Sequence, residues 1–196
     1  MKKFEYTPPE QPRELILKLG QKITDRIGHT VTAEDPEYYG LEALVTDEMA
    51  EVALKMKVRK PMTLAQAVKA TGKEEMLQEM SNIGLLEYNW ENPKHEKQYV
   101  LPMYVPGSAE FFNMKLDQIK EHPEVASFFE RMAFLPLQKV TPMVPPGGAG
   151  IGMHVIPVEK AIETENESVS VEHISHWLDK YDGKYAAGPC SCRYSR

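Results

Sequence analysis

Apolar residues recur at helical spacing near the start of the chain, directly after a proline-rich stretch. The stripe consists of Leu15, Leu19, Ile23 and Ile27. This four-residue period predicts a first helix over residues 12–27. The next stretch, residues 30–45, is polar and rich in turn-forming residues, so it predicts a connecting loop. Residues 1–45 are therefore expected to form an N-terminal helix followed by a loop.

Three short helical segments follow in close succession. The first opens at Thr46, a residue type that caps helix N-termini, and has acidic residues in its first turn. The second begins at Thr63 and ends at Gly72, and the third ends at Gly84. Glycine commonly ends a helix because it adopts the left-handed conformation without strain. The residues expected to be buried are Met49, Val52, Ala53, Met56, Met76, Leu77, Met80 and Ile83.

After Gly84 the hydrophobic period drops from four to two. "LLEYNW" (residues 85–90) and "KQYVLPMYV" (residues 97–105) are β-prone, and the turn-forming "ENPKHE" separates them. A hairpin directly after two helices and a glycine turn is the element order of a winged helix. Residues 46–105 are therefore predicted to be a winged-helix-like domain.

The rest of the chain predicts helices and a short α/β segment. One helix starts at Ser108 as its cap and runs to about residue 121, and another starts after Pro123. Their expected core residues are Phe111, Phe112, Leu116, Val125, Phe128, Phe129 and Met132. Residues 106–140 form this helical segment. Residues 141–196 combine a Gly/Pro-rich loop, a strand, a helix near residues 170–183, a strand and a Cys-x-Cys turn. The predicted fold class is α+β, mainly α, a winged-helix-like domain with flanking helices and a short C-terminal α/β segment.

Two features of this last segment invite a ligand. The glycines Gly147, Gly148, Gly150 and Gly152 are compatible with a phosphate loop. Their spacing is one residue short of G-x-G-x-x-G and no lysine follows directly, which favours a surface loop. His173 and His176 can share a helix face and bind a metal if a third ligand arrives. Without that ligand, a partly buried surface beside Trp177 is the favoured interpretation.

Composition bounds the function. The 196 residues are 42% hydrophobic, enough for a real core, and 29 acidic against 23 basic side chains give a net charge of -6. The exposed positions of the third helical segment, residues 73–79, are net negative, and only "KMKVRK" (residues 55–60) is a basic run. A negative face repels phosphate, so DNA is an unexpected partner. A packing or dimerisation module is expected instead.

The same composition indicates where the protein resides. No apolar run approaches the roughly 20 residues of a membrane helix, and the first 15 residues lack the apolar core of a signal peptide. A cytoplasmic protein without a membrane partner is therefore expected. Two cysteines do not make a disulfide scaffold.

The two cysteines, Cys190 and Cys192, are the candidate cofactor-binding and metal-binding residues. A disulfide between them closes a strained small ring. Zinc and iron-sulfur clusters normally take four protein ligands, so two thiolates make half a site. Pro189 presets the backbone and Arg193 lowers the pKa of a neighbouring thiol, which suits a ligand loop. No catalytic residue is assigned.

The chain resembles the N-terminal region of large iron-sulfur oxidoreductases of anaerobic bacteria and archaea. The resemblance lies in "QYVLPMYVPGSAEFF", "MHVIPVEKAI" and "AAGPCSCR". It implies that Cys190 and Cys192 are two of four ligands of a four-iron four-sulfur cluster that transfers electrons. It also implies downstream redox domains or a redox partner protein, with FAD and NAD(P) only in a longer parent. No cysteine follows Cys192, so a truncated, inactive product with an incomplete site is expected.

Two alternatives remain open. A winged-helix transcriptional regulator with a thiol or metal sensor accounts for both the domain and the cysteines, since a homodimer through the domain pools four thiolates. A non-catalytic docking module for a redox partner is the other, because methionine-rich and aromatic-rich surfaces suit protein contacts.

Overall fold

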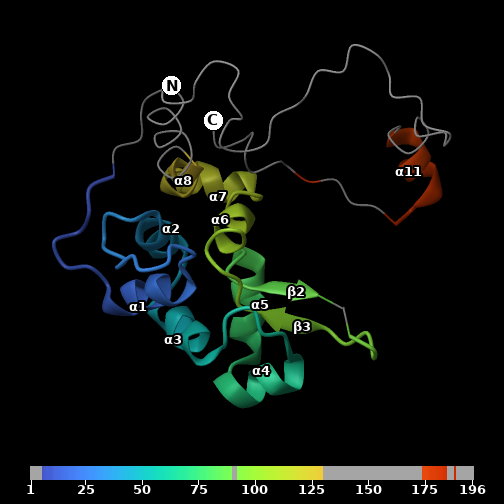
Figure 1. Cartoon of the computed structure of the whole chain (residues 1–196), viewed down its shortest axis with the longest axis horizontal. Coiled ribbons are helices and arrows are strands. Elements are labelled where there is room, and N and C mark those ends of the chain that lie inside the picture. Colours follow the sequence, from blue (N-terminus) through green and yellow to red (C-terminus); the bar gives the residue numbers. More distant parts are fainter. Residues whose placement is uncertain (1–5, 90–91, 130–173, 185–187, 189–196) are drawn as a thin grey trace, which may run out of the picture. The chain divides into compact units, whose positions relative to one another are not determined.

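The computed structural model describes residues 6–89, 92–129, 174–184 and 188. These residues fall into two units, with residues 6–129 in the first and the remainder in the second. The first unit is rich in helix and contains one three-stranded antiparallel sheet (Figure 1). The predicted class, α+β and mainly α, is confirmed at this level.

Eight α-helices are described in the first unit. They are α1 (Glu14–Ile23), α2 (Pro36–Leu44), α3 (Asp47–Lys55), α4 (Leu64–Thr71), α5 (Glu74–Ile83), α6 (Ser108–Phe112), α7 (Leu116–Glu121) and α8 (Ser127–Phe129), with a 3-10 turn, η1, at Pro123–Val125. Helix α1 packs against α2 and α3. In the second unit the described helix is α11 (Ile174–Lys180), which lies within the predicted helix, and Gly183 follows it in the left-handed conformation.

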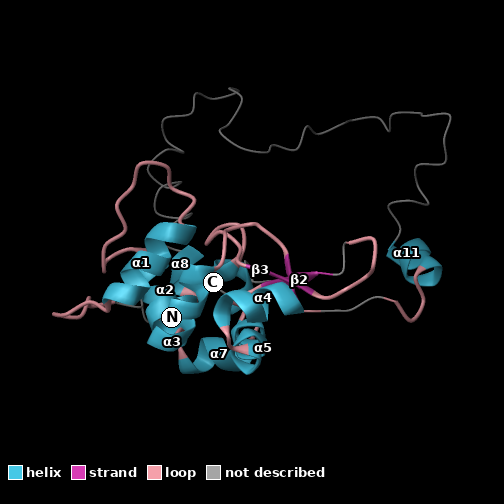
Figure 2. Cartoon of the chain, turned by 90° about the horizontal axis from the view of Figure 1, so that it is seen from below, coloured by secondary structure: helices cyan, strands magenta, loops and turns pink. Residues whose placement is uncertain are grey.

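The sheet has the order β1-β3-β2, with antiparallel pairing on both sides of the central strand. The strands are β1 (Met62–Thr63), β2 (Glu87–Asn89) and β3 (Gln98–Val100). Tyr99 in β3 is paired with Met62 on one side and Tyr88 on the other. The predicted hairpin is therefore confirmed, whereas β1 was missed because two residues carry no readable period. In Figures 1 and 2 the hairpin of β2 and β3 lies on one side of α5, and helices α1 and α3 lie on the other side.

The predicted start of α3, start and end of α4, and end of α5 are confirmed. The Thr46 hydroxyl accepts a hydrogen bond from the Met49 amide at 3.2 Å, and the Thr63 hydroxyl accepts one from the Gln66 amide at 3.3 Å. Gly72 and Gly84 end α4 and α5 with φ of 73° and 94°. These local signals worked because each cap satisfies helix-end groups within a few residues.

Helix α1 is shorter than predicted, and the expected burial of Ile27 is wrong because that side chain is fully exposed. The helix ends at Ile23 since the following residues bind a buried carboxylate. The Thr24 hydroxyl donates to Glu37 at 2.7 Å, and the Arg26 guanidinium donates to both oxygens of Glu37 at 2.8 and 2.5 Å. Glu37 is completely buried, so these partners supply the hydrogen bonds and countercharge that it needs there.

A second carboxylate, that of Asp35, binds the same arginine, and we call Arg26, Asp35 and Glu37 the charged corner. Asp35 accepts hydrogen bonds from the Arg26 guanidinium at 2.8 Å and from the Thr32 amide at 2.6 Å, and its Oδ1 lies 3.0 Å from the His29 ring. Burial by itself raises the pKa of Asp35, but these hydrogen bonds outweigh burial and bring the pKa to about 2. The carboxylate is therefore ionised at neutral pH and holds the α1–α2 connection in place.

The loop predicted over residues 30–45 contains a helix, α2, and the prediction is wrong there. Pro36 occupies its first turn, a position where the missing amide hydrogen costs nothing. Tyr38 and Tyr39 are completely buried, as is Leu41, so tertiary packing stabilises a segment whose sequence looks polar. The segment was predicted to be a loop because its tyrosines show no clear helical period of apolar residues and its glycine at position 40 is a residue type common in turns.

The helix predicted from Ser108 to about residue 121 is two helices, α6 and α7. Buried Asn113 follows α6, and its side-chain amide donates to the Ala109 carbonyl at 2.8 Å and to the Val125 carbonyl at 3.0 Å. Asparagine interrupts helices by such competing hydrogen bonds. Phe112 is buried as predicted, whereas Leu116 is 38% exposed and not a core residue. Ser108 was predicted to cap this helix, but it is the first residue of α6 and Gly107 is the cap. The Gly107 amide donates a hydrogen bond to the Glu110 carboxylate at 2.7 Å.

One continuous core joins these elements, and Tyr104 is buried in it. The Tyr104 amide donates to the Ile23 carbonyl at 2.7 Å, and its hydroxyl donates to the Pro36 carbonyl at 2.7 Å. Its ring meets Phe128 edge to face at 5.5 Å between centroids. Burial raises the pKa of Tyr104 well above its ordinary value, which keeps the hydroxyl a donor. A Cβ at Gly40 would collide with this hydroxyl, so α2 needs glycine there.

We expect Gly40→Ala and Tyr104→Phe to be non-additive. The first introduces a collision and should cost about 1–3 kcal/mol of unfolding free energy. The second removes the buried hydrogen bond to the Pro36 carbonyl and should cost about 1–2 kcal/mol. Because phenylalanine has no hydroxyl to collide with, the double variant should lose about 1 kcal/mol less than the sum. Urea unfolding followed by circular dichroism measures all three, and strict additivity would contradict the described contact.

Candidate functional site

The residues that sequence reasoning marked for cofactor chemistry lie mainly outside the described residues. This holds for Cys190, Cys192, His173 and the glycines of residues 147–152, while His176 is a residue of α11. Within the described ranges, no group of three or more His, Cys, Asp or Glu side chains is arranged to hold a metal ion. The surfaces of the described part and a groove in it are therefore the places to look for chemistry.

Helix α5 presents a carboxylate-rich face. Leu77 and Met80 turn inward and are completely buried, as predicted. The exposed residues of α5 are Glu74, Glu75, Gln78, Glu79 and Asn82. The lysine just before the helix, Lys73, is 2.6 Å from Glu48 of α3, so its charge is already paired. The exposed face of α5 therefore offers negative charge and amide groups to a partner.

The hairpin that follows α5 uses its lysine at position 97 internally. The Lys97 ammonium lies 4.5 Å from the Tyr88 ring centroid and 4.9 Å from the Tyr99 ring centroid. It also donates a hydrogen bond to Gln78 of α5 at 3.0 Å. Cation-π and hydrogen-bond contacts of this kind fix a lysine that would otherwise sample solvent. The hairpin is thereby tied to α5, and Lys97 is engaged within the molecule.

The hairpin turn is shaped by an asparagine. Asn92 donates from its side-chain amide to the Glu96 carbonyl at 2.6 Å, and its side-chain oxygen accepts from the amides of Lys94 and Glu96 at 3.1 and 3.2 Å. His95 adopts a left-handed φ of 51° within this turn. Lys94 and His95 are exposed at the tip, next to exposed Glu96. The tip thus carries mixed charge.

A basic segment begins at the last residue of α3 and leads toward β1, and we define residues 55–60 as the basic loop. Its exposed cations are Lys55, Lys57, Arg59 and Lys60. The basic loop adjoins the end of β3, because Val58 forms a β-bridge with Leu101, the residue just after this strand. The hairpin tip adjoins the start of β3, because Gln98, the first residue of the strand, follows the tip. The basic loop and the hairpin tip therefore lie at opposite ends of β3.

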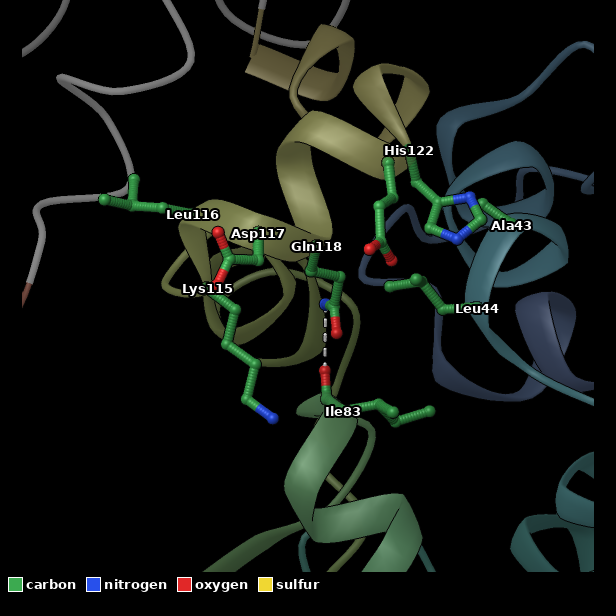
Figure 3. A pocket seen from close by; sticks show the side chains of 9 residues that line it. Ala43, Leu44, Ile83, Lys115, Leu116, Asp117, Gln118 and His122 are labelled. Carbon is green, nitrogen blue, oxygen red and sulfur yellow. Dashed lines mark hydrogen bonds between the residues drawn. The ribbon is translucent and has the colours of Figure 1, made fainter.

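A groove of about 670 Å³ lies between α2, α5 and α7 (Figure 3). Its described lining residues are Ala43, Leu44, Ile83, Lys115, Leu116, Asp117, Gln118, Glu121 and His122. Gln118 closes one wall by donating to the Ile83 carbonyl at 3.1 Å, and the His122 ring points toward Ala43 and Leu44, whereas Leu116 points away. The described lining residues include no serine, threonine or cysteine, so the groove offers non-covalent contacts to a ligand.

No protein-family model, curated protein or solved structure matches the chain. Every helix in the described ranges is too short or too polar to span a lipid bilayer. The surfaces themselves are therefore the basis for a functional proposal.

Sequence reasoning found the acidic face of α5 and the basic run at residues 55–60, but it missed the engagement of Lys97. A count of charges along the hairpin treats Lys97 as free. The signal that could have found it is the alternation of Tyr88 and Tyr99 with Lys97 on paired strands, because cross-strand neighbours lie within reach of a long side chain.

We expect Lys97→Ala to destabilise the hairpin more than Lys94→Ala does. Removing the ammonium from Tyr88 and Tyr99 should cost about 0.5–1 kcal/mol, the range for partly exposed cation-π contacts. Lys94 is an exposed residue of the same hairpin, so its replacement should stay within about 0.5 kcal/mol. Urea unfolding of both variants provides the comparison, and equal losses would show that the ring contacts contribute nothing.

Proposed function

We propose that the chain is the N-terminal scaffold and partial cluster-binding part of an iron-sulfur oxidoreductase. We propose further that residues 46–105 form a winged-helix-like domain that makes protein contacts rather than gripping DNA. The cysteine pair supports the first part, and the topology and charge of the described surfaces support the second.

The topology supports a winged-helix-like domain. Helices and strands follow the order α3, β1, α4, α5, β2, β3, and the last strand lies between the other two. In such a domain α5 takes the place of the recognition helix and the hairpin of β2 and β3 takes the place of the wing. The glycine turn at Gly72 separates the two helices that precede the hairpin.

The charge of this domain favours a protein partner. A helix that reads DNA presents cationic or amide groups, because most contacts go to phosphate. Helix α5 exposes three glutamates, Lys97 of the hairpin is held by two tyrosines, and the basic loop lies at the opposite end of β3 from the hairpin tip. A duplex docked on α5 would face net negative charge.

The observation that carries the cluster proposal is the sequence "PCSCR" at residues 189–193. Thiolates are the donors that iron-sulfur clusters take, so Cys190 and Cys192 fit the group by type but supply two of the four usual ligands. When bound, the cluster would supply one-electron transfer. Pro189 would preset the ligand backbone, and Arg193 would stabilise negative charge on the thiolates. The other two ligands would come from a further segment or from a partner chain.

We expect the natural gene product, purified without oxygen in its own assembly and supplied with iron and sulfide, to bind about four irons per site and to absorb broadly in the visible range. Cys190→Ser with Cys192→Ser should abolish both signals. Ser191→Ala is the matched control, because it alters the same turn without removing a thiolate, and it should retain both. Unchanged iron content and absorbance in the double cysteine variant would defeat the assignment.

We also expect no retardation of random-sequence or genomic duplex fragments in a gel-shift assay at low salt, where nonspecific phosphate contacts are strongest. The carboxylates of α5 provide the reason. A transcriptional regulator, the competing function, would retard the duplex. Retardation that is lost on replacing residues of α5 would establish that function in place of the proposed one.

A further inference from the structure

The basic loop is an accumulation of unpaired positive charge. Lys55, Lys57, Arg59 and Lys60 are exposed, and none of them forms an ion pair with any described residue. Some other cations of the described residues are, by contrast, ion-paired. Arg13, Lys73 and Arg26 bind carboxylates at 2.7, 2.6 and 2.8 Å, respectively. In a chain with a net charge of -6, four free cations within six residues are a concentrated patch.

The backbone of the basic loop is fixed although its charges repel one another. The Arg59 amide donates to the Leu101 carbonyl at 2.8 Å, and the Lys60 amide donates to the Lys57 carbonyl at 3.3 Å. The Lys22 ammonium binds the Met56 carbonyl at 2.5 Å, just before the loop turns. Arg59 itself has a left-handed φ of 56°, a conformation that non-glycine residues adopt at an energetic cost. The loop is therefore preorganised to present its cations outward.

The exposed face of α5 is the complementary feature. Glu74, Glu75 and Glu79 are exposed, and none of them is ion-paired within the described part of the chain. Glu75 and Glu79 are four residues apart, so they lie on the same side of the helix and repel each other. A cationic partner placed over this face would relieve that repulsion. Within one copy the basic loop forms no ion pair with these glutamates.

We propose that the chain associates with a second copy of itself through ion pairs between the basic loop of one copy and the exposed glutamates of α5 in the next. This contact is heterologous, because each copy contributes a different surface to it. The proposal rests on the proposed use of the winged-helix-like domain for protein contacts, and it names the partner. The partner is identified by charge complementarity between two surfaces that are both exposed and both unpaired.

The contact must be weak and sensitive to salt. Exposed ion pairs gain little in water, and the Debye length falls from about 30 Å at about 0.01 M salt to about 3 Å at about 1 M. Association should therefore appear at low salt and high protein concentration. A heterologous contact also leaves one free surface of each kind at the ends of an assembly, so the average mass should rise continuously with concentration unless a ring closes.

Sedimentation equilibrium of the wild-type chain tests this directly. At about 0.01 M salt the weight-average mass should rise above that of the monomer with concentration, and at about 1 M salt it should return to the monomer mass. A loop variant with Lys55→Glu, Lys57→Glu and Lys60→Glu should remain monomeric at low salt. This variant leaves Arg59 and its left-handed backbone unchanged.

A helix variant with Glu75→Lys and Glu79→Lys should also remain monomeric alone. A mixture of the two variants should associate at low salt, because the acidic loop of one then meets the basic helix of the other and both contacts are restored. Lys94→Glu is the matched control, since it reverses an exposed charge at the hairpin tip and should associate like the wild type. Far-ultraviolet circular dichroism of each variant confirms that it is folded.

Several outcomes would overturn the proposal. One is a wild-type chain that stays monomeric at low salt, and another is association that survives in both variants. Failure of the two folded variants to associate when mixed would place the contact elsewhere. A monomeric chain that binds duplex through the basic loop would overturn the protein-contact role as well. A monomeric chain that binds no duplex would overturn self-association alone and leave the proposed function standing.

Discussion

The placement of Tyr104 is the constraint on which the arrangement of the first unit depends. This residue follows the last strand, yet its amide bonds to the end of α1 and its hydroxyl bonds to the start of α2. Both bonds are buried, so each must be satisfied within the protein. The segment that follows β3 is thereby attached to the N-terminal helices. Glycine at position 40 leaves the space that the Tyr104 hydroxyl occupies. The N-terminal helices and the sheet consequently share one core.

This shared core decides which residues remain for function. Because Leu77 and Met80 anchor α5 from inside, its glutamates are left on the surface. In the charged corner Arg26 forms ion pairs with Asp35 and Glu37, and Lys73 forms one with Glu48. These charged groups are therefore neutralised within the protein. Among the exposed charges of the described residues, those of the basic loop and those of the glutamates of α5 form no ion pair with another described residue. The location of these unpaired charges, more than the net charge, sets which partner each surface can accept.

Sequence reasoning succeeded where a structural signal is local and failed where a distant residue decides the conformation. The caps at Thr46 and Thr63 and the glycine stops are completed within four residues, so they could be predicted. The early end of α1 depends on Glu37, which is more than ten residues away and buried. The break between α6 and α7 depends on a bond from Asn113 to Val125, and no period in the sequence encodes that bond.

The candidate surfaces divide in the same way. Residue types alone identify the two cysteines as candidate ligands and the glutamates of α5 as acidic groups. The availability of a lysine does depend on its neighbours, as Lys97 shows by lying over two tyrosine rings while Lys57 and Lys60 have no described partner. Counting lysines would treat the hairpin and the basic loop as similar. Their different surroundings make the hairpin a fixed structural element and leave the basic loop as the cationic surface on which a second copy can dock.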